Sequence, residues 1–510
     1  MKITLVNPPI SLEDVYGRFR KLASFQPPVG LASLAGYLLP HGHEVQIIDC
    51  NALGMSVKQA VREIQSNPPD LLGLYTISYN YPCIERLVKG IRDVNKSLKI
   101  VAGGPHVTFL PEQTMEDTTI DYCVLGEGEE PLLELVQRLD GDLNNRDLSD
   151  VAGLAYRSSD GEIIVTSERL TVKDIDSIPF PAIHLLPSLD KYELYLLHHK
   201  RLPYMTVASS RGCPYKCVFC ETPSGKTVRA HSPEYVVDYL QHLSKDYGVK
   251  EAFFVDDTFT LNEKRVLKIC DLMLKKNLDF TWSGTAHANV KNMDMFKVMR
   301  KAGCWIVALG AETGNQKIID TLDKGTTLEN IRATAKGITD AGLKLKTFFV
   351  LGNPGDTIET IDETIQFAKS LKGHFPVFSL MTPYPGAPLW KTAEQYGTFD
   401  RSGFDKLLLA TSDPVFVPYG LTQKDLISKQ KEAFRTNYFS VGMVLRHLQK
   451  TESLRDFMVL VKAFMQFLKV QFTFIKQFEL VGEESLSFKS NKLPSPLSVE
   501  TNLKRGSTAI

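Results

Sequence analysis

The chain has 510 residues, enough for two or three domains. Its 59 basic and 59 acidic residues balance, so nothing favours bulk nucleic-acid binding, and the composition is that of an ordinary globular protein. Of the eight cysteines, three are clustered and five are scattered through apolar segments, which argues against a secreted disulfide framework. The N-terminus shows no signal-peptide pattern, so we expect a cytoplasmic protein.

Residues 1–145 alternate short apolar runs with helical patterns, the order typical of parallel βαβ units. Strands are expected at 3–6, 45–49, 71–76, 100–102 and 122–125, and helices at 31–39, 57–65, 84–94 and 131–138. Glycine-rich loops follow the last two strands, and ligands of such sheets bind outside the carboxyl ends of the strands. The pattern predicts a doubly wound, Rossmann-like domain. Because a phosphate-binding G-x-G-x-x-G is absent, a purely structural role stays equally open.

Residues 146–200 are predicted to connect two domains. Alternating residues on both sides of Asp160-Gly161 predict a β-hairpin. The prolines of 178–181 suit neither a helix nor a central strand. We expect no chemistry in this connector.

Three cysteines, Cys213, Cys217 and Cys220, follow a predicted short buried strand with the spacing C-x3-C-x2-C. Thiolates are soft ligands suited to iron–sulfur clusters and zinc. A four-iron cluster is ordinarily closed by four cysteines, so three leave one iron open to a substrate or cofactor. The alternatives are three unrelated thiols or a zinc knuckle, which usually pairs C-x2-C with a second ligand pair.

Residues 201–390 contain six strand–helix repeats. The strands are expected at 205–209, 252–256, 280–285, 305–309, 347–351 and 377–381, with helices at 235–243, 264–275, 295–301, 328–341 and 360–371. Polar residues recur just after strands, where barrel enzymes place their active sites. These are Asp256, Asp257, His287, Asn289, Glu312 and the turn 352–355.

This arrangement resembles the radical S-adenosylmethionine (SAM) superfamily, whose hallmark is this cysteine spacing after a first barrel strand. The segments FVDDTFT (254–260), GAETG (310–314), GNPGDT (352–357) and PYPG (383–386) resemble that superfamily's turns in order. The resemblance implies a partial (β/α)6 barrel and a four-iron cluster on the three cysteines. It assigns SAM contacts to Asp256, Asp257, Glu312, Gly352 and Gly355. His287 and Asn289 stand where the subgroup more often has arginine and aspartate, which leaves the substrate contacts open.

Residues 1–145 look like the cobalamin-binding domain in front of many radical SAM enzymes. The likeness rests on NPP (7–9), GLASLA (30–35), GGPH (103–106) and GEGE (126–129). It assigns cobalamin contacts to Asn51, Gly103, Gly104, His106, Gly126 and Glu127. Many cobalamin proteins carry D-x-H-x-x-G, whose histidine ligates cobalt, whereas this chain has Asn51 in place of that histidine. We therefore expect cobalamin without a protein histidine on cobalt, with His106 the spare imidazole.

Residues 391–480 are predicted to be helical, at 426–439, 444–449 and 457–478. In the last of these, Lys462, Gln466, Lys469, Thr473 and Lys476 form one polar stripe, and the repeated charges do not suit a transmembrane span. A helix packed on the barrel or in a dimer is preferred. The alternative is a membrane-surface helix at the inner face, beside a lipid substrate. The composition of 481–510 predicts a disordered tail.

The resemblance as a whole implies a cobalamin-dependent radical SAM enzyme. Methylation is the preferred reading because it is a common outcome in this architecture: a 5′-deoxyadenosyl radical activates a carbon, and methylcobalamin supplies the methyl group. The expected partners are a small-molecule or lipid substrate and an electron donor such as flavodoxin or ferredoxin, with no nucleic acid. The alternatives are an oxidative cyclase of the anaerobic magnesium-protoporphyrin ester cyclase type, an epimerase or ring-forming enzyme, and a non-enzymatic cobalamin sensor. The intact cysteine triad disfavours the sensor.

Overall fold

A computed structural model describes residues 1–10, 25–141, 147–169, 171–192, 199–404, 407 and 414–438. The helices predicted at 444–449 and 457–478 and the predicted tail lie outside these residues. Two large sheets, the first mostly parallel and the second parallel, organise the described chain. We call the part built on the first the N-terminal lobe and the part built on the second the barrel lobe.

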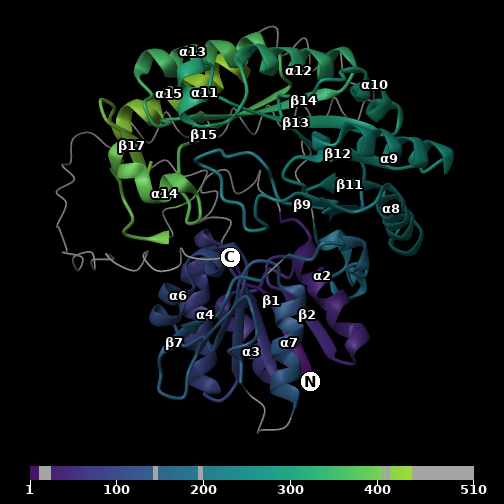
Figure 1. The fold of residues 1–510 in the computed structure, drawn as a ribbon, viewed down its shortest axis with the longest axis vertical. Helices are drawn as coiled ribbons and strands as arrows, with labels where there is room; N and C mark the ends of the chain where they lie inside the picture. The colour runs from purple at the N-terminus through teal and green to yellow at the C-terminus, as the bar shows by residue number, and fades with distance from the viewer. Residues whose placement is uncertain are drawn as a thin grey trace, which may run out of the picture. The chain divides into compact units, whose positions relative to one another are not determined.

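The sheet of the N-terminal lobe has the strand order β2-β1-β3-β4-β5-β6-β7. Its five parallel strands are β1 (Lys2–Asn7), β2 (Glu44–Asp49), β3 (Leu71–Tyr75), β4 (Lys99–Gly103) and β5 (Tyr122–Val124), as the sequence predicted. Helices α2 (Val29–Leu38) and α7 (Glu129–Asp140) contact each other, and so do α3 (Val57–Ser66) and α4 (Tyr81–Val94); Figure 1 shows both pairs against the sheet. Because both faces are covered, neighbouring residues of β1 are buried on opposite sides of the sheet: Leu5 joins one core cluster and Val6 the other.

The predicted hairpin is present as β6 (Leu154–Arg157) and β7 (Ile163–Val165), but it is not a free connector. β6 pairs antiparallel with β5, with Tyr156 opposite Tyr122, so the hairpin continues the sheet of the N-terminal lobe. The backbone groups at the edge of β5 are thereby paired. Alternation and Asp-Gly predict a hairpin locally, whereas its partner strand depends on the fold. Two short helices that the sequence did not predict, α5 (Pro105–Phe109) and α6 (Pro111–Asp117), follow β4.

The barrel lobe is a six-stranded parallel sheet in the order β15-β14-β13-β12-β11-β8. All six predicted strands are present, as β8 (Tyr204–Val207), β11 (Glu251–Phe254), β12 (Thr281–Ala286), β13 (Cys304–Glu312), β14 (Lys344–Leu351) and β15 (Phe375–Leu380). The helices are α8 (Pro233–Tyr247), α9 (Glu263–Lys275), α10 (Asp294–Lys301), α11 (Gln316–Thr321), α12 (Leu328–Asp340) and α13 (Ile358–Ser370), and Figure 1 shows them along the outer side of the sheet. β8 and β15 do not pair, so the barrel is partial.

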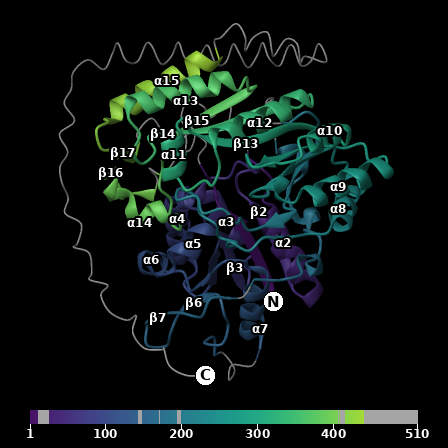
Figure 2. The same ribbon diagram turned by 45° about the horizontal axis from the view of Figure 1, so that its top comes forward.

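The last described elements follow the barrel. They are α14 (Pro388–Thr392), the antiparallel pair β16 (Gly397–Phe399) and β17 (Phe416–Pro418), and α15 (Gln423–Tyr438). Helix α15 agrees with the helix predicted at 426–439 and packs against α13 and β15 (Figure 2). Within the described ranges, no helix is both long and apolar enough to cross a membrane.

Candidate functional site

The three clustered cysteines lie on one closed loop of the barrel lobe. The loop leaves the carboxyl end of β8, and its base is a short antiparallel pair, β9 (Ser210–Arg211) and β10 (Arg229–Ala230). Gly212 begins the loop with φ 86°, and a Cβ on it would lie 2.4 Å from the carbonyl oxygen of Thr227. Only glycine suits this turn, so Gly212 closes the base of what we call the cysteine loop, residues 212–228.

The thiols of the cysteine loop lie near enough to influence one another. Desolvation raises the pKa of Cys217, and the neighbouring Cys213 adds to the shift. Desolvation raises the pKa of Cys220 to about 12, with further contributions from Cys217 and Asp257, although its side chain keeps solvent contact. Metal binding would therefore release protons from these thiols.

The donor set fits an iron–sulfur cluster better than a single ion. Among the described residues, no three His, Cys, Asp or Glu side chains converge closely enough to hold one metal ion. In a four-iron cluster each thiolate ligates a different iron, so its ligands stand farther apart than those of one ion. Three adjacent soft thiols on one loop match that requirement.

Asp256 and Asp257 follow β11 directly but face different surroundings. Asp256 is buried and accepts hydrogen bonds from the Ser209 amide at 2.6 Å, the Ser209 hydroxyl at 2.5 Å and the Ser210 hydroxyl at 2.8 Å. Desolvation raises its pKa, and these hydrogen bonds oppose the shift. Asp257 instead lines a cavity, and desolvation followed by repulsion from Asp256 raises its pKa. Asp256 thus fixes Ser209 and Ser210, the residues that lead into the cysteine loop. Asp257 is the carboxylate that can contact a ligand in the cavity.

Glu312 ends β13 in a left-handed backbone conformation, with φ 62°. Its Oε1 accepts a hydrogen bond from Nζ of Lys324 at 2.9 Å, and both side chains are buried. Burial opposes the charge on Lys324, yet Glu312 and Cys217 hold the lysine's pKa above its ordinary value. Sequence reasoning missed Lys324, because it lies in the α11–α12 connection outside any recognised motif.

His287 and Asn289, which follow β12, contact the same region. The His287 ring stacks on Tyr215 of the cysteine loop with centroids 3.6 Å apart, and burial followed by the charge of Lys324 lowers its pKa to about 4. Asn289 donates to the Gly325 carbonyl at 2.8 Å and accepts from Thr326. Both residues thus support the cysteine loop and the Lys324 segment.

Gly352 and Gly355 lie in the turn after β14, both with positive φ. Leu426 of α15 covers Gly352, since a Cβ there would lie 3.0 Å from that side chain. Val350, at the end of β14, packs in the same apolar cluster as Phe219 of the cysteine loop. The turn therefore lies next to the cysteine loop but does not line the cavity described next.

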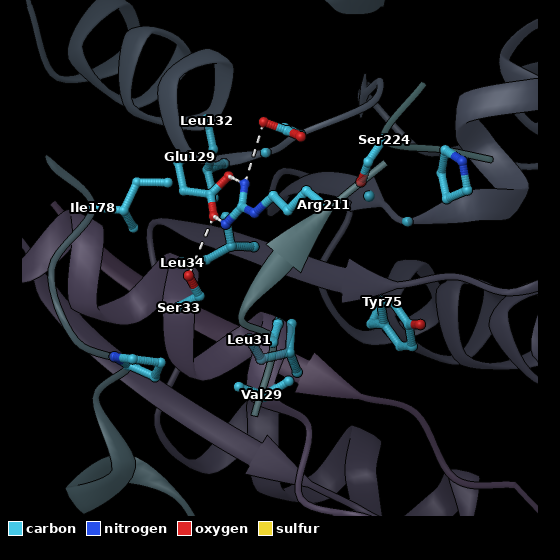
Figure 3. A pocket seen from close by; sticks show the side chains of 18 of the residues that line it. Val29, Leu31, Ser33, Leu34, Tyr75, Glu129, Leu132, Ile178, Arg211 and Ser224 are labelled. Atoms are coloured by element: carbon cyan, nitrogen blue, oxygen red, sulfur yellow. Dashed lines mark hydrogen bonds and ion pairs between the residues drawn. The ribbon is translucent and has the colours of Figure 1, made fainter. Parts of the chain in front are cut away.

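A cavity of about 380 Å³ lies between the two lobes. The N-terminal lobe contributes α2 and the ends of β3, β4 and β5, including Gly103 and Gly104, while the barrel lobe contributes Asp257 and residues of the cysteine loop. Figure 3 shows the apolar side chains Val29, Leu31, Leu34 and Leu132 on its wall. Gly30 and Gly126 also line it, and a Cβ on either would meet nothing within 4 Å. A glycine-lined, largely apolar space beside the cysteine loop fits a large cofactor that contacts backbone.

Two residues assigned to cobalamin by the sequence do not line this cavity. His106 is fully buried, with Nδ1 3.2 Å from the Ser78 hydroxyl and its ring stacked on Tyr81, and desolvation lowers its pKa to about 4. Asn51 donates to the Pro8 carbonyl at 2.9 Å and accepts from the Ile10 amide at 2.7 Å. Both are engaged in packing or loop contacts within the N-terminal lobe.

Glu127, in the loop after β5, and Glu129, the first residue of α7, both form ion pairs with the barrel lobe. Arg211 donates to Glu129 at 2.6 and 3.2 Å, and Arg229 donates to Glu127. Figure 3 shows Arg211 between Glu129 and a further carboxylate. Sequence reasoning assigned Gly126 and Glu127 to cobalamin and missed the side-chain pairs, because their partners lie more than 80 positions away.

Known proteins resemble the chain along most of its length. Residues 17–136 match the family model of the B12 binding domain, and residues 207–368 match that of the Radical SAM superfamily. An uncharacterized methyltransferase of Pyrococcus horikoshii is 33% identical over 453 residues, which cover 88% of this chain and 95% of that protein. The anaerobic magnesium-protoporphyrin IX monomethyl ester cyclase of Rubrivivax gelatinosus is 27% identical, with 88% and 80% covered. The cytidylyl-2-hydroxyethylphosphonate methyltransferase of Streptomyces wedmorensis is 25% identical, with 78% and 83% covered.

Solved structures share the fold. The cobalamin-dependent S-adenosylmethionine radical enzyme OxsB, with aqua-cobalamin and S-adenosylmethionine bound, superposes with a TM-score of 0.70 at 18% identity, covering 94% of this chain and 75% of that one. The radical S-adenosylmethionine methyltransferase TsrM of Kitasatospora setae, with tryptophan and a SAM analogue bound, gives 0.63 at 18% identity, with 88% and 87% covered. Both combine the two lobes described above in one fold.

Proposed function

The chain belongs to the family of cobalamin-dependent radical SAM enzymes, and from that membership we propose that it transfers a methyl group to a carbon of a small-molecule substrate. Its cofactors are a four-iron cluster, SAM and cobalamin. When bound, they supply a carbon-centred radical and a transferable methyl group, while the protein supplies orientation and exclusion of water. The observation that carries the proposal is the glycine-lined cavity between the lobes, bounded on one side by the cysteine loop.

Within this proposal the residues divide the work. Cys213, Cys217 and Cys220 hold the cluster, and Asp256 fixes the backbone that leads into their loop. Asp257 and the Glu312–Lys324 pair bind the charged amino acid end of SAM, since a carboxylate attracts its ammonium and a lysine its carboxylate.

On the opposite wall, Gly103, Gly104 and Gly126 admit the corrin to the backbone. The β6–β7 hairpin, which the sequence analysis placed in the connector, belongs to the N-terminal lobe. A one-electron donor such as flavodoxin or ferredoxin reduces the cluster. We propose no role at cobalt for His106 or Asn51, because both are engaged elsewhere.

The decisive experiment is anaerobic reconstitution with SAM labelled in its methyl group, a chemical reductant and cell extract as the source of substrate. Methyl transfer predicts 5′-deoxyadenosine, S-adenosylhomocysteine and a product heavier by one labelled methyl group. Cyclisation of the kind named for the Rubrivivax relative predicts 5′-deoxyadenosine with no label in the product. Corrinoid binding without either nucleoside product would indicate a sensor and contradict the proposal.

Cysteine variants provide the matched controls. Cys217→Ala should lose the visible absorption of the cluster and all SAM cleavage, because one of three ligands is gone. Cys270→Ala and Cys304→Ala should keep both, since these thiols are buried in α9 and at the start of β13. Undiminished iron and sulfide in Cys217→Ala would contradict the ligand assignment.

A further inference from the structure

The base of the cysteine loop is attached to the N-terminal lobe at both of its ends. In the β9–β10 pair, Arg211 and Arg229 are directly opposite each other, so the two arginines bracket the loop that holds the three cysteines. Arg211 is two positions before Cys213. Any displacement of these two side chains therefore displaces the start and the end of the loop together.

Both arginines are paired with carboxylates at the junction between β5 and α7, where Glu127 lies in the connecting loop and Glu129 begins the helix. Arg211 donates through Nη2 to Oε1 of Glu129 at 2.6 Å and through Nη1 to Oε2 at 3.2 Å, a bidentate arrangement. Arg229 donates through Nη1 to Oε2 of Glu127 at 2.8 Å and through Nη2 to Oε1. Nη1 of Arg211 also lies 3.3 Å from Glu127, which joins the two pairs into one network.

The network is enclosed in protein. The Glu127, Glu129 and Arg229 side chains are at most 10% exposed and that of Arg211 is 18% exposed. Although burial would raise the pKa of Glu129, Arg211 holds it below its ordinary value, so the carboxylate is charged. Ser33 of α2 donates to the same carboxylate at 3.2 Å and fixes its position within the N-terminal lobe. Planar bidentate pairs of this kind restrict orientation as well as distance.

The carboxylates lie where the N-terminal lobe meets the cavity. Glu127 follows β5 on the loop that includes Gly126, and Glu129 begins α7. Both carboxylates and Arg211 line the cavity. One network of ion pairs thus connects the cavity wall of the N-terminal lobe, where cobalamin is proposed to bind, with the base of the cysteine loop, which is proposed to hold the cluster.

We propose that Arg211 is a positioning residue which, through Glu129 and with Arg229 and Glu127, sets the distance and orientation between the cluster and cobalamin. This inference rests on the proposed function, because it presumes that both cofactors bind. Arg211 contacts neither reacting atoms nor cysteine sulfur in this role. It acts by fixing the position of the cysteine loop relative to the N-terminal lobe at the cavity.

The test is the magnetic interaction between the two cofactors, which needs no substrate. Protein reconstituted with cluster and cob(II)alamin is reduced, and microwave power saturation of the cob(II)alamin signal is measured with the cluster paramagnetic and with it diamagnetic. In the unaltered protein the paramagnetic cluster should speed relaxation of cob(II)alamin. Arg211→Lys keeps the positive charge but loses the two parallel hydrogen bonds of the guanidinium, and Glu129→Gln loses the negative charge. In both variants the relaxation enhancement should fall toward the value measured without a paramagnetic cluster.

Arg201→Lys is the matched control. Arg201 forms a bidentate pair with Asp279 at 2.7 and 2.8 Å, but both residues belong to the barrel lobe. Its relaxation enhancement should equal that of the unaltered protein. Should Arg211→Lys not fold, Glu129→Asp, which keeps the charge on a shorter side chain, takes its place in the same measurement.

The outcomes separate the two proposals. An unaltered protein that binds no corrinoid or no cluster would contradict the proposed function itself. Full cofactor loading in the Arg211 and Glu129 variants with unchanged relaxation would overturn the positioning role and leave the proposed function standing. A lower melting temperature with unchanged relaxation would likewise show that the network only stabilises the fold.

Discussion

Adjacent residues of the same type have separate roles in this protein. Asp256 is buried with both carboxylate oxygens bonded to Ser209 and Ser210, whereas Asp257 lines the cavity. The motif FVDDTFT assigned both residues to SAM, because a motif shows that two acidic residues follow a barrel strand but not which way each side chain points. Asp257 lies in the turn that begins after β11, so its side chain leaves the chain in another direction from that of Asp256 and reaches the cavity.

Glu312 and Lys324 should bind SAM as a pair. Glu312→Gln removes the charge that meets an ammonium group, and Lys324→Met removes the partner that holds Glu312 in place. Each change should raise the SAM dissociation constant about tenfold or more, since hydrogen bonds to charged groups are worth about 1.5–3 kcal/mol. Calorimetric titration of SAM into cluster-loaded protein measures the effect.

Lys317→Met is the control for this pair, because Lys317 is an exposed residue of α11 in the same part of the barrel lobe. Its SAM affinity should not change. If Glu312→Gln keeps full SAM affinity and only its melting temperature falls, the carboxylate serves the fold and not the ligand.

Strand β14 places one lysine, Lys346, where its charged form is poorly hydrated. Leu345, Phe349 and Leu351 are buried in the main core cluster, and Lys346 and Phe348 alternate with them on the other side of the strand. Nζ of Lys346 lies 5.0 Å from the centroid of the Phe348 ring. Desolvation lowers the pKa of Lys346 to about 8.

Lys346→Met should therefore stabilise the barrel lobe at neutral pH. Below pH 8 the lysine is charged in both folded and unfolded chains, and the folded state bears the full desolvation cost. Between about pH 8 and 10.4 the folded lysine loses its proton before the unfolded one, so the cost disappears as pH rises. We expect a gain of about 1–2 kcal/mol at pH 7 that declines toward pH 10, allowing for partial exposure.

Urea unfolding of Lys346→Met and the unaltered protein at several pH values measures this difference. Lys336→Met on α12, whose lysine is exposed, is the control and should show no such pH dependence. A stability difference that stays constant from pH 7 to pH 10 would contradict a desolvated charge at Lys346.

At the scale of the molecule, the two lobes enclose the candidate site between the carboxyl ends of their sheets. His106 belongs to the packing and not to this space: its ring lies against Tyr81 and edge-on to Phe404, which comes from the segment after the barrel. A histidine held between two aromatic rings cannot turn to a cofactor without breaking that packing.

We therefore expect cob(II)alamin in this protein to show no axial nitrogen from a protein histidine. Electron paramagnetic resonance of protein labelled with ¹⁵N-histidine checks this, because labelling would change the superhyperfine pattern of a histidine ligand. His106→Ala should leave the spectrum unchanged while lowering stability. A nitrogen splitting that responds to the label and disappears in His106→Ala would identify His106 as the ligand.

The order of the helices and strands could be predicted from the amino-acid sequence, because the signals for helices and buried strands are local. All eleven expected strands of the two sheets are present, since continuous apolar runs bounded by turn residues are typical of sheets covered on both faces. The cysteine spacing likewise predicted an iron–sulfur cluster before any fold was known. That the three cysteines are ligands stays a prediction, although their thiols do influence one another's pKa.

The contacts between residues far apart in the sequence became visible in the folded chain alone. Arg211 pairs with Glu129 at a separation of 82 positions, the β6–β7 hairpin joins the first sheet, and Lys324 reaches Glu312 from a connection without a motif. These contacts depend on how the fold brings distant loops together, and a buried charge is stable only where its partner is present. No local pattern in the sequence carries that information, so the network between the lobes is a property of the folded chain.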